Sequence, residues 1–235
     1  MKKSLVLLTA MLSFAVCADA ANDGHELWLS MERNAAAASV TVEGKPLSKN
    51  NIVQTAAEEL RAYWKGDDVV MALGNADVGD DGFCVVRENG RIRLTARNAS
   101  GLLYGAYDML RKQQQNPCGK ALLRDTMYRQ TPANELRILN HWDNPNGTVE
   151  RGYAGRSIFW KENGMADLTV IKDYGRACAS VGINAAVLNN VNAKPLMLSK
   201  GKLQETKRIA DALRPYGIKV FLSVNFASPK VLGGL

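Results

Sequence analysis

The 235-residue chain is 46% hydrophobic and 23% charged, which is ordinary for a globular protein and allows one large domain or two small ones. Its formal net charge of +7 is scattered without a run of five Lys or Arg residues, so we expect no nucleic-acid partner. Its four cysteines form no CxxC pair and it has only two histidines, so neither a zinc site, nor a disulfide framework, nor a cofactor is expected.

The first 20 residues, 1–20, predict a secretory signal peptide. Lys2 and Lys3 precede an apolar segment from Leu5 to Val16, and Ala18-Asp19-Ala20 supplies small residues at a cleavage position. The alternative is an uncleaved anchor helix, which the short apolar segment disfavours. We therefore expect a bacterial protein that is secreted or periplasmic, with no membrane anchor after cleavage.

Residues 21–130 predict an α/β domain, which we interpret as sandwich-like. Asn89-Gly90 marks a hairpin turn between two strands. Asn51 with Gln54 resembles a capping box at the start of one helix, and Ser100 is the expected cap of the next. A polar segment from Gln113 to Thr131 predicts a connector. Apolar periodicity predicts strands 39–42, 68–73, 83–87 and 92–96, and helices 51–64 and 100–112.

Residues 131–235 predict repeated strand–helix units. Gly182 and Gly217, 35 residues apart, each end a helix and precede a strand. Unbroken apolar runs such as Ala185 to Leu188 are typical of parallel strands that are buried on both faces. The expected elements are strands 136–139, 183–188 and 218–224, and helices 168–181 and 203–213. We predict the first three β/α units of a (β/α)8 TIM barrel, with a doubly wound sheet as the alternative.

A closed barrel needs eight such units in roughly 250 residues, so we expect this chain to be the N-terminal part of a longer protein. Glycosidases need two carboxyl groups on either side of the scissile bond. The second and third predicted strands end without a carboxylate, so no complete catalytic pair is visible in the sequence.

Ligands of a barrel bind at the loops that follow the strands. Trp142 follows the first strand within a polar cluster, where an aromatic face suits a sugar ring, although a Trp is more often core. Its neighbour His141 is a candidate base or a structural hydrogen-bond partner. Asn190 and Asn225 end the next two strands and either bind ligand or satisfy turn backbone groups.

The loop from Asp143 to Ala166 is longer than usual for a βα connection, which favours a functional role. It contains Glu150 and Arg151. An arginine over a barrel mouth is suited to a substrate carboxylate, which it binds through two parallel hydrogen bonds. The alternative is that Glu150 and Arg151 form an ion pair that braces the loop.

Several segments of the second region resemble glycoside hydrolase family 67, the α-glucuronidases. They are Asn140-His141-Trp142-Asp143-Asn144, Gly147 to Gly155, Val187 to Ala193, Arg214 to Val220 and Ser223 to Pro229. The resemblance starts near residue 25 and is most specific in 135–235. It implies an α/β N-terminal domain, a (β/α)8 barrel and a helical C-terminal domain. It also implies that (4-O-methyl)glucuronic acid is released from xylooligosaccharides with inversion and without a metal.

The resemblance assigns an aromatic contact in the acid-binding pocket to Trp142 and a hydrophobic contact to Val191. Glu150 and Arg151 belong to the family motif without an assigned role. The acid and base lie on later barrel strands of the family, so we expect the catalytic residues beyond Leu235. We therefore expect no catalytic residue and no activity in this chain alone.

The expected partners are glucuronoxylan-derived oligosaccharides, and a homodimer is expected only of the full-length enzyme. Two other functions stay open at this point. One is a non-catalytic carbohydrate-binding protein on the same scaffold, and the other is a different glycosidase, such as a hexosaminidase, with a similar N-terminal domain.

Overall fold

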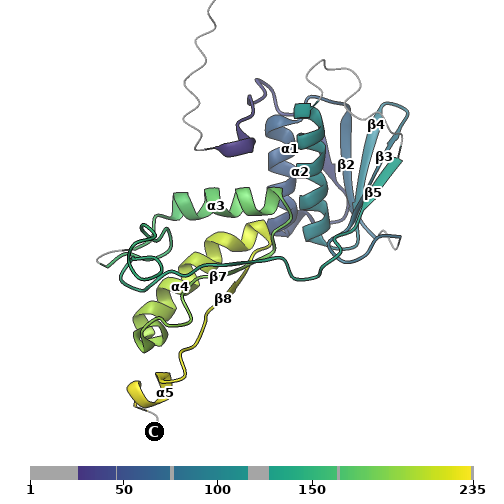
Figure 1. The fold of residues 1–235 in the computed structure, drawn as a ribbon. Helices are drawn as coiled ribbons and strands as arrows, with labels where there is room; N and C mark the ends of the chain where they lie inside the picture. Colours follow the sequence, from purple (N-terminus) through teal and green to yellow (C-terminus); the bar gives the residue numbers. More distant parts are fainter. Residues whose placement is uncertain (1–25, 46, 75–76, 116–126, 163–164, 234–235) are drawn as a thin grey trace, which may run out of the picture. The chain divides into compact units, whose positions relative to one another are not determined.

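The computed structural model describes residues 26–45, 47–74, 77–115, 127–162 and 165–233 (Figure 1). By its internal contacts the chain divides into two units, residues 1–30 and residues 31–235. The described part of the first unit is a 3₁₀ turn, Leu27–Leu29. The predicted signal peptide, residues 1–20, lies outside the described residues. None of the helices within the described ranges is both long enough and apolar enough to cross a membrane.

The second unit contains a mixed five-stranded sheet with the order β1-β2-β4-β3-β5. Strands β1, β2 and β4 are parallel, whereas β3 runs antiparallel to both β4 and β5. The predicted hairpin between β3 and β4 is confirmed, because Asn89 and Gly90 have φ values of 51° and 73°, the left-handed pair that a tight hairpin turn requires. The strands are β1 (Val40–Val42), β2 (Asp68–Leu73), β3 (Phe83–Glu88), β4 (Arg91–Ala96) and β5 (Met127–Gln130).

Strand β5 lies in the segment that the sequence predicted to be a connector, so that prediction was wrong at 127–130. The strand is short, mostly polar and largely exposed, and therefore carries no alternating apolar signal. It forms by pairing with β3 at the edge of the sheet, where Tyr128 makes an edge-on contact with Phe83 at 6.2 Å between ring centroids.

Helices α1 (Asn51–Tyr63) and α2 (Ala99–Gln115) pack together on this sheet (Figure 1). The predicted apolar face of α1 is buried. The predicted caps were each misplaced: the Asn50 side chain accepts hydrogen bonds at the start of α1, and Asn98 accepts one from the Gly101 amide at the start of α2. In both cases the capping side chain belongs to the residue that directly precedes the first helical residue.

Helix α2 is buried around its whole circumference from Gly101 to Leu110, where the sequence predicted one buried face. The reason is that it contacts β3 and β4 on one side, and α1 and α3 on others. Gly105 permits the close approach to the sheet, because a Cβ there would lie 2.4 Å from Cδ1 of Leu94.

A second sheet contains three parallel strands in the order β6-β7-β8, with Ile138, Ala185 and Lys219 in register. Gly182 and Gly217 have φ values of 79° and 71° and end the helical segments before β7 and β8, which confirms the predicted repeat. The fold is therefore α/β in both sheets. The elements are β6 (Ile138–Asn140), α3 (Leu168–Ser180), β7 (Ala185–Val187), α4 (Lys200–Leu213), β8 (Lys219–Phe221) and α5 (Ser228–Val231).

Burial of the second sheet differs from the prediction. Only the central strand β7 is largely buried, whereas Leu139 in β6 and Phe221 in β8 are 37% and 43% exposed. Strands β6 and β8 are the edges of this sheet within the described residues, so each is covered by a neighbour on one side only. Val181, expected to face inward from the end of α3, is 50% exposed because it already lies beyond the last helical turn.

Candidate functional site

The carboxyl end of β6 leads directly into His141, whose amide donates to the carbonyl of Val187 and continues the pairing with β7. The imidazole contacts Phe159 and Tyr174 edge-on, with ring centroids 4.9 Å and 5.4 Å away. Its Nε2 lies 2.8 Å from the Tyr174 hydroxyl. Burial lowers the pKa of His141, and the nearby charge of Asp143 opposes that shift only in part. The ring is therefore a neutral anchor between β6, the long loop and α3.

Asp143, an acidic residue that follows the first predicted strand, is 5% exposed. Burial raises the pKa of its carboxyl group, against the effects of a hydrogen bond with Ser157 and the charge of His141. Its backbone carbonyl accepts a 2.8 Å hydrogen bond from the amide of Asn190. Asp143 thus links the loop after β6 to the loop after β7.

Trp142 lies between the half-buried His141 and the buried Asp143 and is 43% exposed. Alternate residues of an extended segment point to opposite sides, so the inward-facing side chains of His141 and Asp143 turn Trp142 outward. Val191, after β7, is 50% exposed. Because the Asp143–Asn190 hydrogen bond joins the two loops, both apolar side chains belong to one connected edge of the sheet.

The long loop after β6 is folded. Two isolated β-bridges join Asp143 to Val149 and Thr148 to Arg156. The side-chain amide of Asn144 donates to the Thr148 hydroxyl at 3.0 Å and to the Glu150 carbonyl at 2.8 Å. The loop is thereby held against the end of β6.

The far end of this loop is fixed by Trp160, which is 1% exposed and whose Nε1 donates to the carbonyl of Leu188 at 2.7 Å. Glu150 adopts a φ of 57°, and its amide donates to the carbonyl of Trp142. Within residues 127–162, no ion pair joins Glu150 to Arg151. Arg151, which directly follows Glu150, is exposed.

The asparagines at the strand ends make local hydrogen bonds. The side-chain oxygen of Asn190 accepts from the amide of Asn192, and that of Asn225 accepts from the amide of Ala227. Asn189, the first residue after the second predicted strand, connects two strand ends, because its side chain bonds both the amide and the carbonyl of Ser223. These bonds fix the loops around Trp142 and Val191.

Possible metal ligands do not gather in this region. Across the described ranges, no three His, Cys, Asp or Glu side chains lie close enough together to hold a metal ion. Cys84 and Cys178 are buried and form no disulfide within the described residues, and burial raises the pKa of the Cys178 thiol. Cys118 lies outside the described residues.

The catalytic acid and base were expected beyond Leu235, and Leu235 itself also lies outside the described residues. The last strand that the structure describes is β8, Lys219–Phe221, which carries no carboxylate. The position of the catalytic pair beyond Leu235 therefore stays a prediction.

A sequence profile described as the glycosyl hydrolase family 67 middle domain matches residues 118–235, half of the chain. The chain belongs to glycoside hydrolase family 67. The match contains the second sheet and all seven residues that sequence analysis selected: His141, Trp142, Glu150, Arg151, Asn190, Val191 and Asn225.

Curated relatives of this family 67 chain include fungal proteins. It is 41% identical over 160 residues to "Probable alpha-glucuronidase A" of Aspergillus niger, 68% of this chain and 18% of that protein. It is 43% identical over 165 residues to "Alpha-glucuronidase" of Hypocrea jecorina, 66% of this chain and 19% of that protein. It is 37% identical over 202 residues to "Alpha-glucuronidase A" of Emericella nidulans, and this match covers 83% of this chain and 23% of that protein. The match therefore spans about a fifth of the length of these relatives.

Solved structures share the fold of this family 67 chain at low sequence identity. A Streptomyces plicatus N-acetyl-beta-hexosaminidase superimposes with a TM-score of 0.51 at 14% identity, over 81% of this chain and 42% of that chain. A family GH138 enzyme targeting pectin rhamnogalacturonan II superimposes with a TM-score of 0.55 at 13% identity, over 79% of this chain and 30% of that chain. The likeness to the hexosaminidase is one of fold, whereas sequence identity decides for family 67.

Proposed function

We propose that this chain is part of an α-glucuronidase that releases (4-O-methyl)glucuronic acid from xylooligosaccharides with inversion. The observation that carries the proposal is its 41% identity over 160 residues to a relative named as a probable α-glucuronidase. The family 67 profile match over residues 118–235 includes the candidate site. We further propose that β6, β7 and β8 are the first three strands of a (β/α)8 barrel. Their parallel order and the 35-residue repeat support this proposal.

In this proposal, Trp142 and Val191 contact the sugar acid. Both side chains are about half exposed after neighbouring parallel strands, where ligands of β/α folds bind. His141, Asn190 and Asn225 support the loops, and the Glu150–Arg151 segment borders the same edge. The aromatic face of Trp142 would cover the C–H face of the sugar ring, while its hydroxyl and carboxylate groups meet the polar surroundings.

Titration of glucuronic acid into the ¹⁵N-labelled chain, followed by NMR, tests the binding part of the proposal. We expect saturable shifts of the Trp142 indole and the Val191 amide, and weaker binding in Val191→Ala. Val181→Ala is the matched control, because Val181 is also 50% exposed but lies at the end of α3. If both substitutions leave the affinity unchanged, or if Trp142 does not respond, the assignment of the site is wrong.

The catalytic part concerns the acid and base, which the family resemblance assigns to later strands, beyond Leu235. We expect this chain alone to release no glucuronic acid from aldouronic acids, and the longer protein that contains it to do so with inversion. Turnover by the purified 235-residue chain above a mock-purified blank would contradict that assignment. Residues 1–20 are proposed as an export signal that is cleaved, so retention of Met1 in exported protein would contradict that cleavage.

A further inference from the structure

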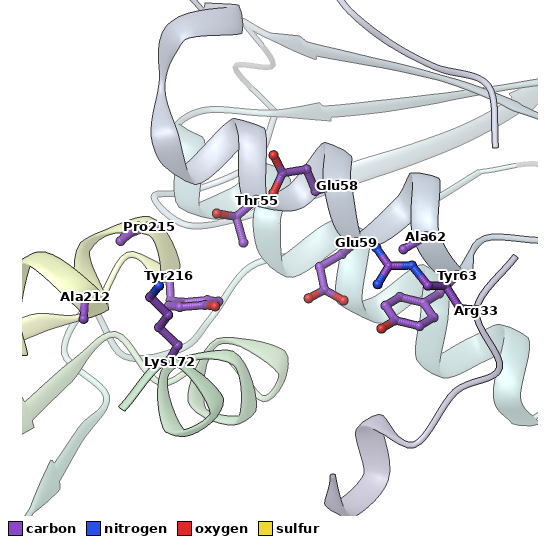
Figure 2. Close-up of a pocket in the computed structure, with 10 residues that line it drawn as sticks. All are labelled: Arg33, Thr55, Glu58, Glu59, Ala62, Tyr63, Lys172, Ala212, Pro215 and Tyr216. Carbon is purple, nitrogen blue, oxygen red and sulfur yellow. The ribbon is translucent and has the colours of Figure 1, made fainter. Parts of the chain in front are cut away.

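A second cavity lies away from the strand ends, among α1, α3 and the 3₁₀ turn Arg214–Tyr216 that follows α4 (Figure 2). Its volume is about 320 Å³. Small-molecule sites usually begin near 300 Å³, so this cavity has room for a short sugar. None of the residues that line it was selected as a binding residue from the sequence, and none takes part in the proposed glucuronidase site.

Two half-buried tyrosines give the cavity aromatic surfaces. Figure 2 shows Tyr63 at one end and Tyr216 at the other, with Glu59 between them. Tyr216 packs closely on α3, because a Cβ on Gly175 would lie 2.6 Å from its ring. A fixed, partly exposed aromatic ring can support the apolar face of a sugar at low entropic cost.

The charges around the cavity are unevenly paired. Glu59 is held by Arg176 through two hydrogen bonds of 2.7 Å and 3.0 Å, and these two charges compensate each other. Within the part of the chain that the structure describes, Arg33 and Lys172 form no ion pair. Glu58, at the rim, points away from Glu59 in Figure 2. Of the four charged residues that line the cavity, Arg33 and Lys172 are therefore the two cations that remain available to an anionic ligand, alongside Glu58 at the rim.

Arg33 and Tyr63 form the more specific end of the cavity. The guanidinium carbon of Arg33 lies 5.9 Å from the centre of the Tyr63 ring, and that of Arg176 lies 5.1 Å from it. Arg176 is occupied by Glu59, so Arg33 is the guanidinium available to a ligand carboxylate. Lys172, at the Tyr216 end in Figure 2, is suited to donate hydrogen bonds to hydroxyl groups.

We propose that this cavity is a second carbohydrate site that binds a short acidic oligosaccharide, with its carboxylate on Arg33 and a neighbouring sugar ring on Tyr216. A neutral sugar would leave Arg33 without an anionic partner, and a single phosphate would not use the aromatic surface at the far end. The site goes beyond the proposed hydrolase site, because it is formed by α1, α3 and the turn after α4.

NMR titration of the ¹⁵N-labelled full chain with an aldobiouronic acid, glucuronosyl-xylose, tests this proposal, and xylobiose serves as the neutral comparator. We expect saturable shifts at Tyr63 and Tyr216, and affinity at least about tenfold lower for xylobiose. Arg33→Gln should weaken aldobiouronate binding about tenfold without changing binding of xylobiose. Arg91→Gln is the matched control, because Arg91 is also exposed but lies outside the cavity. Tyr216→Ala should weaken both ligands, and Tyr153→Ala on the exposed loop should weaken neither.

Ligand binding at each of the two proposed sites should shift the NMR signals of different residues. The same titration therefore distinguishes a failure of one proposal from a failure of the other. Shifts confined to Trp142 and Val191 would support the hydrolase site and overturn the second site. Shifts confined to Tyr63 and Tyr216 would do the reverse. Equal affinities of Arg33→Gln and Arg91→Gln, or equal binding of the acidic and neutral sugars, would also overturn the second site.

Discussion

The ion pair between Glu59 on α1 and Arg176 on α3 connects elements that lie against the two sheets, and removal of either partner alone should destabilise the fold strongly. The two side chains are 11% and 15% exposed and make two hydrogen bonds. Burial alone would lower the pKa of Arg176, but the hydrogen bond and charge of Glu59 outweigh it and raise that pKa. Removing one partner of a buried pair costs about 3–5 kcal/mol, because the other charge stays buried without compensation.

For Glu59→Gln we expect the lower end of that range, about 3 kcal/mol, because water still reaches a tenth of the pair. In a chain of this size each kcal/mol lowers Tm by about 2–4 °C, so Tm should fall by about 6–12 °C. Asp211→Asn is the matched control. Asp211 pairs with Lys207 and Arg214, the side chains of Asp211 and Lys207 are 44% and 76% exposed, and its loss should cost much less than the loss of Glu59 because solvent screens these charges.

Urea unfolding followed by circular dichroism should be measured for Glu59→Met, Arg176→Met and the double variant. The double variant should be close to the wild type, because apolar side chains of similar size replace a desolvated pair. The coupling energy from the cycle should therefore reach about 2 kcal/mol or more. The reasoning is refuted if Glu59→Gln costs no more than Asp211→Asn, or if the double variant loses the sum of the two single losses.

Three further predictions concern single residues. Trp142→Ala should weaken glucuronic acid binding by about 1–3 kcal/mol in a titration, and it should lower Tm less than Trp160→Ala, since Trp160 is 1% exposed and its loss costs about 3–5 kcal/mol. Burial lowers the pKa of His141 in the folded state, whereas the unfolded chain accepts a proton on this residue near pH 6.5. The free energy of unfolding, measured in urea, should therefore fall as the pH drops from 7.5 to 5.5. The fall should be steeper in the wild type than in His141→Gln. Gly105→Ala should destabilise by about 1–3 kcal/mol, because its Cβ meets Leu94. Gly201→Ala, where a Cβ enters open space in α4, should stabilise by up to about 1 kcal/mol in the same thermal melts.

The strands and helices whose side chains follow one clear period were predictable from the sequence. The apolar face of α1 and the Asn89-Gly90 turn are local patterns, and each is decided within a few residues. The spacing between Gly182 and Gly217 predicted two parallel strands correctly, because each glycine ends a helical segment in the left-handed conformation.

The elements that the sequence misjudged depend on distant partners. Strand β5 has little apolar alternation and is formed by hydrogen bonds to β3, more than 40 residues earlier. The full burial of α2 requires α3, which follows a separate strand. Neither partner is visible in a window of sequence around the element, so local periodicity could not have indicated them.

Candidate binding residues were predictable as positions, since residues that follow parallel strands gather at one edge of a sheet. Their surroundings were not. The contacts of His141 come from Phe159 and Tyr174, which lie 18 and 33 positions later in the sequence. The link between Asp143 and Asn190 is a backbone hydrogen bond, and backbone groups leave no signal in side-chain patterns.

The polar side chains at the strand ends stabilise the loops of the candidate site, whereas the exposed apolar side chains are the ones available to a ligand. The Nε2 of His141 faces Tyr174, the carboxyl group of Asp143 is buried beside Ser157, and the side-chain oxygen of Asn190 accepts from the local backbone. Each of these groups would have to give up an internal partner before it could bind a sugar, and that exchange lowers the net gain from a new hydrogen bond. Trp142 and Val191 have no such competing bonds and are half exposed. The chemistry of this edge therefore favours apolar contact with one face of a sugar, on loops that the polar groups have already fixed in place.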